Sequence, residues 1–125
     1  MNKITITSGQ ITLNAELNDS PAAREIWGSL PIEGRANTWG DEVYFEIPVV
    51  IVQEPNARAD VEVGELGYWP TGRAFCVFFG PTPVSIDEQP RAYSPVNILG
   101  QVLDDATLFK AVKDGDRVTI DKQTD

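Results

Sequence analysis

The chain of 125 residues has 10 basic and 19 acidic side chains, which give it a net charge of −9 at pH 7. This charge repels nucleic-acid phosphates and anionic membranes, so we expect neither as a partner. The sequence contains no histidine, the most common general base and metal ligand. We therefore expect no metal ion and no cofactor, and only carboxylate, tyrosine, lysine or arginine chemistry remains available.

A chain of this length fits one domain, which we assign to residues 1–125 with a frayed tail over about 121–125. The single cysteine, Cys76, cannot form an intramolecular disulfide. The N-terminal residues alternate apolar and polar, unlike a signal peptide. The longest apolar run, residues 48–52, is far shorter than the roughly 20 residues of a membrane span. Together these features predict a cytoplasmic protein.

The first half of the chain predicts a β-hairpin, a helix and further strands. Alternating apolar residues predict strands over 3–7 and 10–17, joined by a turn at Ser8-Gly9. Pro21 predicts the first turn of a helix, with Asp19 or Ser20 as its N-cap, and residues 28–31 end it. Strands over 36–39 and 42–47 follow, with a turn at Gly40-Asp41; the apolar face of the latter holds residues 43, 45 and 47.

The second half has weaker alternation and more glycine and proline. Residues 53–60 have the composition of an exposed loop, and 60–63 predict a short strand. Residues 64–73 form a glycine-rich segment with aromatic residues, and it precedes an apolar strand that we expect to be buried on both faces. Residues 81–95 predict a long irregular segment. A strand over 96–103 with a bulge at Gly100, a short helix or turn over 105–112 and a last strand over 117–120 complete the chain. The pattern predicts a small closed barrel or sandwich of about seven or eight strands with one or two short helices.

Three blocks, in the same order along the chain, resemble the cyclophilin family. Residues 20–30, Ser-Pro-Ala-Ala-Arg-Glu-Ile-Trp-Gly-Ser-Leu, are similar to the first cyclophilin helix. Residues 43–48, Val-Tyr-Phe-Glu-Ile-Pro, stand where the family has Phe-His-Arg-x-Ile-Pro. Residues 64–67 and 72–77 stand where it has Gly-x-Leu-Ser-Met-Ala and Gly-Ser-Gln-Phe-Phe-Ile. The likeness is wider to the short prokaryotic cyclophilin-like proteins of unestablished function, and there also covers residues 36–45, 64–83 and 91–97.

The resemblance implies a single closed cyclophilin-like β-barrel and peptidyl-prolyl cis/trans isomerisation. That reaction lowers a rotation barrier of about 20 kcal/mol and needs no proton transfer. In the family it needs an arginine that donates to the prolyl nitrogen, and an apolar pocket. Here Phe45 stands at the arginine's position, no arginine or lysine occurs from 36 to 57, and Ala74 and Cys76 replace the glutamine and a phenylalanine of the groove. The resemblance therefore implies a degenerate groove.

Six residues are our candidates for binding a ligand in that groove: Phe45, Arg58, Tyr68, Trp69, Arg73 and Phe78. By its alternation, Phe45 belongs either to the core or to the groove floor. Tyr68 and Trp69 form an aromatic platform or pack at the barrel rim, and the two arginines are either cationic contacts or solvated.

Other residues are candidates only under a stated condition. Trp39 is a further aromatic candidate. The carboxyl groups of Asp41, Glu42 and Glu65 would act as acid or base only if burial raised a pKa. Cys76 lies in an apolar strand and is expected to be inert. Residues 91–94, Arg-Ala-Tyr-Ser, either close over the groove or pin the long segment before them.

We predict that the domain binds a peptide or small ligand in its degenerate groove, with little or no catalysis. An isomerase that uses a relocated arginine, Arg58 or Arg73, is the alternative from the enzyme class. A structural or oligomeric module is the third, and would be favoured if the aromatic residues were buried against one another. The oligomeric state and the ligand do not follow from the sequence.

Overall fold

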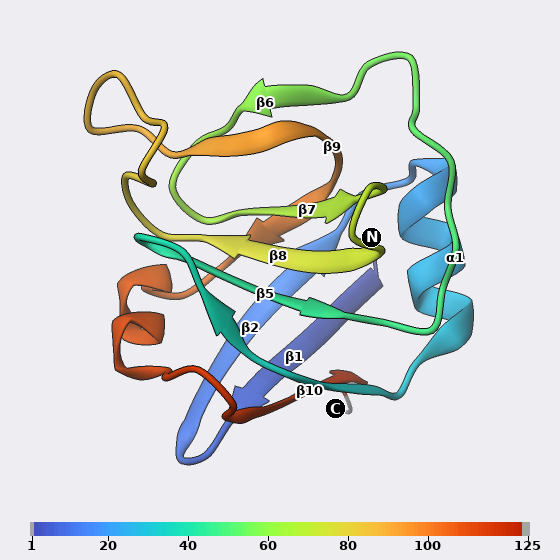
Figure 1. Ribbon diagram of the computed structural model, residues 1–125. Helices are drawn as coiled ribbons and strands as arrows, with labels where there is room; N and C mark the ends of the chain where they lie inside the picture. The colour runs from blue at the N-terminus through green and yellow to red at the C-terminus, as the bar shows by residue number, and fades with distance from the viewer. Residues whose placement is uncertain (1, 124–125) are drawn as a thin grey trace.

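The computed structural model describes residues 2–123, which form a curled sheet and two short helices (Figure 1). The elements, in chain order, are β1 (Asn2–Ser8), β2 (Ile11–Leu17), α1 (Pro21–Ser29), β3 (Ile32–Arg35), β4 (Asn37–Thr38), β5 (Glu42–Glu46), β6 (Arg58–Asp60), β7 (Glu65–Trp69), β8 (Ala74–Phe78), β9 (Arg91–Val102), the 3₁₀-helix η1 (Ala106–Ala111) and β10 (Arg117–Lys122). The mainly β character and the short helices are as predicted.

The sheet curls, but hydrogen bonds do not close it. Neighbouring strands follow the order β3-β10-β1-β2-β9-β7-β8-β5-β4, and β6 pairs with β9 outside this path. The two end strands, β3 and β4, are separated in the chain by Ala36 alone and pair with β10 and β5 rather than with each other. The predicted closed barrel is therefore not confirmed: within residues 2–123 the ends of the sheet are joined by the chain and not by a ladder.

The helix α1 begins where the sequence predicted. The hydroxyl of Ser20 accepts a hydrogen bond from the backbone N–H of Ala23 at 3.1 Å, and Pro21 occupies the first turn, where its missing donor is not needed. One face of the helix buries Ala22, Ala23 and Ile26 against the sheet. Of the two predicted N-caps, Ser20 is the one used.

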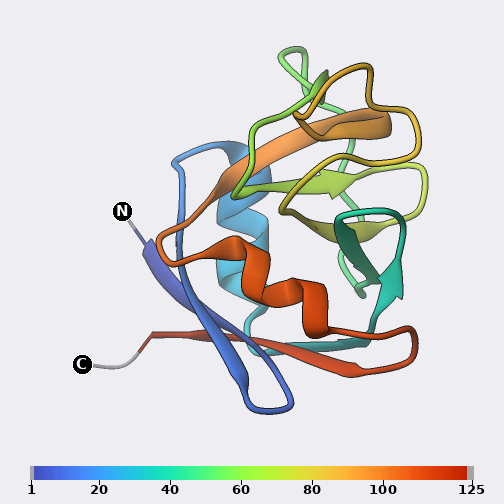
Figure 2. The ribbon, with the colours of Figure 1, turned by 90° about the vertical axis from the view of Figure 1, so that its left-hand side faces the viewer.

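The main core lies on the inner face of the curled sheet. It contains fully buried side chains from β1, β2, β5, β7, β8, β9 and β10, together with residues of both helices. The two views place α1 and η1 at opposite ends of the curl (Figures 1 and 2). From η1, Ala106 and Phe109 are buried in this core. Each helix therefore covers one end of the core that the strands leave open.

A second, smaller cluster lies on the other face of the sheet. Its buried members are Val61, Cys76, Phe78, Ala92 and Val96, and Tyr44, Trp69 and Ile98 pack against it. Since β8 has core residues on one side and this cluster on the other, all five of its residues are buried. The prediction of a strand buried on both faces is confirmed.

The second half of the chain departs most from the predicted boundaries. The glycine-rich segment 64–73 contains a strand, β7, and β6 covers 58–60 rather than the predicted 60–63. The strand β9 begins at Arg91, so the irregular segment is shorter than the predicted 81–95. The early part of β9 pairs with β6, a partner brought from far along the chain, and such pairing leaves no local pattern.

The bulge and the C-terminal strand complete the comparison. Leu66 pairs with Gly100 but the next residue, Gly67, pairs with Ile98, so β9 has an extra residue here and the predicted bulge is confirmed. The last strand runs to Lys122, beyond the predicted end at Ile120, because it pairs with β1. Of the predicted frayed tail, residues 124–125 lie outside the described residues. No helix of the described chain is both long and apolar enough to cross a membrane.

Candidate functional site

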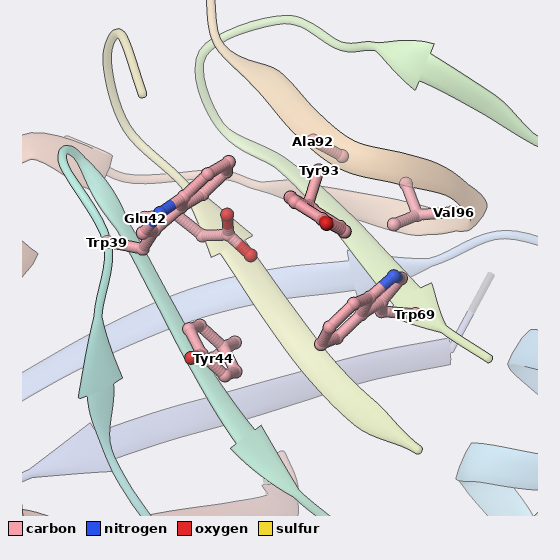
Figure 3. Close-up of a pocket in the computed structure, with 7 residues that line it drawn as sticks. All are labelled: Trp39, Glu42, Tyr44, Trp69, Ala92, Tyr93 and Val96. Carbon is pink, nitrogen blue, oxygen red and sulfur yellow. The ribbon is translucent and has the colours of Figure 1, made fainter. Parts of the chain in front are cut away.

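A pocket of about 140 Å³ opens on the outer face of the sheet, above the second cluster. Its walls come from β5, β7 and β9 and from the turn between β4 and β5 (Figure 3). The residues that line it are Trp39, Glu42, Tyr44, Trp69, Ala92, Tyr93 and Val96. Four of the seven are large aromatic residues, and one is a carboxylic acid.

Alternation along β5 decides which side chains reach this pocket. Phe45 points into the core, where it has no exposed surface, so Glu42 and Tyr44 point to the opposite face. On β8 the residues directly opposite them are Phe78 and Cys76, both of the second cluster. The local pattern of the strand therefore sets a carboxyl group over an apolar floor.

The aromatic walls contact one another in sequence around the opening. The ring of Trp39 lies 6.0 Å from that of Tyr93, with 72° between their planes. Tyr93 lies 6.1 Å from Trp69 at 76°, and Trp69 lies 6.1 Å from Tyr44 at 82°. Edge-to-face pairs of this kind are mutually stabilising. The planes of consecutive rings are thus steeply inclined to one another. Figure 3 shows the four rings around the carboxyl group of Glu42.

Trp69 is held on two further sides. Its indole N–H donates a hydrogen bond of 2.7 Å to the hydroxyl of Ser94, on β9. Its ring packs on Gly72: a Cβ atom there would lie 2.5 Å from two carbon atoms of the ring, closer than any side chain allows. The absence of a side chain at Gly72 therefore allows the Trp69 indole to pack against the turn that follows β7.

Glu42 is the unusual group of the pocket. Its side chain is on the pocket surface, yet the residue is only 5% exposed. Burial raises the pKa of its carboxyl group from the ordinary 4.5 to about 7, and the nearby Cys76 thiol, which donates to the carbonyl of Ala74 at 3.8 Å, offsets only part of this. Within residues 2–123 no nitrogen or oxygen donor bonds to this carboxyl group and no cation pairs with it. The burial required for acid or base chemistry is thus present at Glu42.

Cys76 lies below Glu42 and is fully buried. Burial, and then the neighbouring charge of Glu42, raise the pKa of its thiol well above the usual value. Because only a thiolate is a good nucleophile or metal ligand, Cys76 is inert and acts as a small apolar floor residue. No three metal-ligating side chains are grouped together in the described part of the chain.

The structure does not bring the six predicted ligand-binding residues together. Trp69 lines the pocket, and Phe78 lies beneath it in the second cluster. Phe45 and Tyr68 lie instead in the main core, and both are fully buried. The Tyr68 hydroxyl donates to the carbonyl of Val49 at 2.6 Å and accepts from the N–H of Ile51 at 3.2 Å, so its polar atom anchors the segment after β5.

The two predicted cationic contacts also lie outside the pocket. Arg58 forms a two-pronged pair with the carboxylate of Glu65, at 2.9 and 2.8 Å, and donates to the carbonyl of Asp60. That pairing raises the pKa of the Arg58 guanidinium. Arg73 is exposed in the turn between β7 and β8, with a positive φ of 50°. Neither guanidinium lines the aromatic pocket.

Sequence reasoning missed Val96 as a pocket residue, named Tyr93 only within residues 91–94, and left Glu42 and Trp39 as secondary candidates. A signal existed for Glu42: it lies on the same face of its strand as Tyr44, opposite the apolar residues. Nothing local marked Tyr93, because its place depends on the pairing of β9 with β7 and β6. Of the residues 91–94, Ala92 and Tyr93 line the pocket, while the carbonyl of Arg91 accepts a hydrogen bond from the Thr82 hydroxyl and so holds the segment before β9.

The sequence and the fold were both found to be similar to known proteins. A family model described as cyclophilin-like matches residues 2–121. The solution structure of the hypothetical protein AF2241 from Archaeoglobus fulgidus is similar, with a TM-score of 0.82 and 35% sequence identity over 98% of this chain and 95% of that chain. No curated protein gave a significant match.

A more distant likeness shows the fold alone. The structure of McbB in complex with tryptophan has a TM-score of 0.73 and 20% identity, over 98% of this chain but only 45% of the McbB chain. This chain therefore spans less than half the length of McbB. Since the family model covers nearly all of the sequence, and the archaeal protein shares both fold and sequence with it, the chain belongs to the cyclophilin-like family.

Proposed function

We propose that this domain binds a small organic ligand in the aromatic pocket and does not act there as a peptidyl-prolyl isomerase. The observation that carries the proposal is Glu42, a residue that is only 5% exposed and whose carboxyl group faces the pocket, with no cation and no nitrogen or oxygen donor paired to it within residues 2–123. A largely buried carboxyl group with a raised pKa is typical of sites that bind or react.

The size of the pocket defines the ligand. Pockets that enclose drug-sized molecules have volumes of roughly 300–1,000 Å³, and this one has about 140 Å³. It suits a small molecule, or one side chain or head group of a larger one such as a peptide. Its largely aromatic walls with a single carboxyl group match the usual composition of small-molecule sites.

The positions of the arginines argue against the isomerase alternative. A relocated catalytic arginine would have to point into the pocket that receives the proline ring. Arg58 is committed to Glu65, and Arg73 is exposed beyond β7. The third alternative, a structural module, is disfavoured because the rings are not all buried against one another: Tyr93 is 72% exposed at the pocket mouth.

Tryptophan fluorescence offers a direct test of binding. The sequence has three tryptophans, and two of them, Trp39 and Trp69, line the pocket. In a Trp27→Phe variant all indole fluorescence therefore comes from the pocket. We expect fragments from a library of small organic molecules to change this fluorescence, and to lose more than about tenfold in affinity in Trp69→Ala. Saturation-transfer NMR on the wild type checks the same fragments.

Tyr93→Ala is the second variant, since its exposed position makes a folding defect unlikely to explain a loss of binding. Fragments that bind equally to wild type, Trp69→Ala and Tyr93→Ala would contradict the proposal, as would a library without a single fragment that binds. The non-catalytic part has its own test in the exchange rate of an Ala-Pro peptide measured by NMR. Acceleration by the wild type that disappears in Arg58→Ala or Arg73→Ala would establish the isomerase instead.

A further inference from the structure

The pocket lining contains an acidic residue but no basic residue. Of the residues that line it, Glu42 is the only one that bears a charge at neutral pH, and no lysine or arginine is among them. Asp41, its neighbour in the chain, is 3.9 Å from Lys110 of η1, so that cation is engaged elsewhere. A buried carboxylate without a counter-charge is costly, and a cation that entered the pocket would provide the missing partner.

The walls suit a cation as well. A cation close to an aromatic ring is attracted by the negative charge over the ring face, and sites for quaternary ammonium groups combine several such rings. Trp39, Tyr44, Trp69 and Tyr93 surround the Glu42 carboxyl group in Figure 3. Tryptophan and tyrosine are the stronger ring types for this interaction, and the overall charge of −9 attracts cations at longer range.

We propose that the pocket recognises an organic cation, a methylated or alkylated ammonium head group whose methyl surface contacts the four rings and whose charge is balanced by the Glu42 carboxylate. This inference rests on the proposed function and gives its ligand a chemical class. A fully alkylated ammonium ion needs no hydrogen-bond acceptors, which fits a site with one carboxyl group and otherwise aromatic and aliphatic walls. Anionic ligands are excluded from such a site by the same carboxylate.

Recognition of a cation is coupled to a proton. With a pKa of about 7, the carboxyl group of Glu42 is protonated in roughly half of the molecules at neutral pH when the pocket is empty. A bound cation favours the carboxylate, so binding releases that proton. The other titratable residues near Glu42 are Cys76 on β8, whose thiol pKa burial raises well above its usual value, and Tyr44 and Tyr93, which line the same pocket. Within residues 2–123 no basic side chain lines this pocket.

The test compares two probes of the same shape. Choline carries a trimethylammonium group, and 3,3-dimethylbutan-1-ol replaces its nitrogen with carbon and is neutral. At about pH 8, where Glu42 is ionised, we expect choline to bind at least about tenfold more tightly than the alcohol, measured by the fluorescence of Trp27→Phe and by calorimetry. Below pH 7 the affinity for choline should fall as Glu42 gains its proton, by about tenfold in all, toward the affinity of a pocket without the charge. The affinity for the alcohol should not change in this way.

Glu42→Gln keeps the shape of the side chain and removes the charge. We expect this variant to lose the preference for choline over the alcohol by about tenfold and to lose the pH dependence. Glu46→Gln is the matched control, since Glu46 lies on the same strand but is exposed and does not line the pocket; its binding should equal that of the wild type. Circular dichroism checks that both variants are folded.

Three outcomes overturn the inference: equal affinity for the two probes, a preference that survives in Glu42→Gln, and no binding of choline at any pH. If one of these occurs while neutral fragments still bind in a Trp69-dependent manner, the inference of a cationic ligand is wrong but the proposed ligand-binding function is supported. If no fragment depends on Trp69, the proposed function fails together with the inference.

Discussion

The two faces of the sheet formed by β5, β7 and β8 differ in how their polar side chains are hydrogen-bonded. On the inner face the polar atom of Tyr68 has both a donor and an acceptor partner, and the aromatic pair Phe45 and Phe75 packs at 5.5 Å. On the outer face no nitrogen or oxygen donor of residues 2–123 bonds to the carboxyl group of Glu42, which lies near the Cys76 thiol. The Trp69 indole N–H on the outer face is also paired, with Ser94, so the contrast between the two faces lies in the Glu42 carboxyl group, although the same strands build both. Departures from full pairing of this kind are expected at functional sites, which is consistent with the binding role that we propose for the outer face.

The largest expected effect is on the inner face. Phe45→Ala removes a ring with no exposed surface from the centre of the core, and should lower the free energy of unfolding by about 3–5 kcal/mol. Urea denaturation followed by circular dichroism measures it. Tyr44→Ala, one position earlier on the outer face and half-buried, should lower it by clearly less. Equal losses would mean that the outer cluster supports the fold as much as the core does.

The next effect concerns pH. In the native state Glu42 keeps its proton up to about pH 7, whereas in the unfolded chain it loses it near pH 4.5. Its contribution to stability is therefore complete below pH 4.5, falls as the pH rises between these values, and is lost above about 7. Glutamine at this position does not ionise, so Glu42→Gln should gain stability over the wild type across this range, by up to about 3 kcal/mol.

The measurement is the difference in unfolding free energy between Glu42→Gln and wild type at a series of pH values. Taking the difference removes the contribution of groups that titrate equally in both proteins. A difference that stays constant from pH 4.5 to 7 would show that the carboxyl group is solvated, and would remove the main contrast between the two faces.

The smallest effects come from single hydroxyl groups, one on each face. Tyr68→Phe leaves the buried carbonyl of Val49 and the N–H of Ile51 without their partner, and should cost about 1–3 kcal/mol in unfolding free energy. Ser94→Ala removes the acceptor of the Trp69 indole N–H at a half-buried position that water can reach, and should cost less than about 1 kcal/mol. Thermal denaturation of both variants tests the order; the reverse order would contradict the assignment of the faces.

Much of the fold was predictable because its signals are local. The hairpin of β1 and β2 follows from alternation, and the start of α1 from Ser20 and Pro21. The orientation of Phe45 toward the core was also contained in the pattern of its strand. The strand β7 was missed because glycines interrupt its pattern, and the closed barrel was inferred from strand number, which does not reveal whether the last pair forms.

The candidate site was predicted only in part. Trp69 was chosen for its aromatic ring beside glycine, and Gly72 proves to be the surface on which that ring lies. The arginines were chosen for their charge, but charge alone does not say whether a local acid such as Glu65 already holds the group. Trp39 and Tyr93 are adjacent only because β9 and the turn before β5 meet over β7 and β8, and sequence separation conceals such neighbours.

By itself, the sequence determined which side chains share a face of each strand, where the first helix starts, and the family resemblance. These properties depend on neighbours within a few residues or on motifs read in order. Only the tertiary structure decided that Glu42 is buried and that four aromatic rings surround it. The pKa of a carboxyl group depends on what replaces water around it, and in this protein those groups come from strands far apart in the chain.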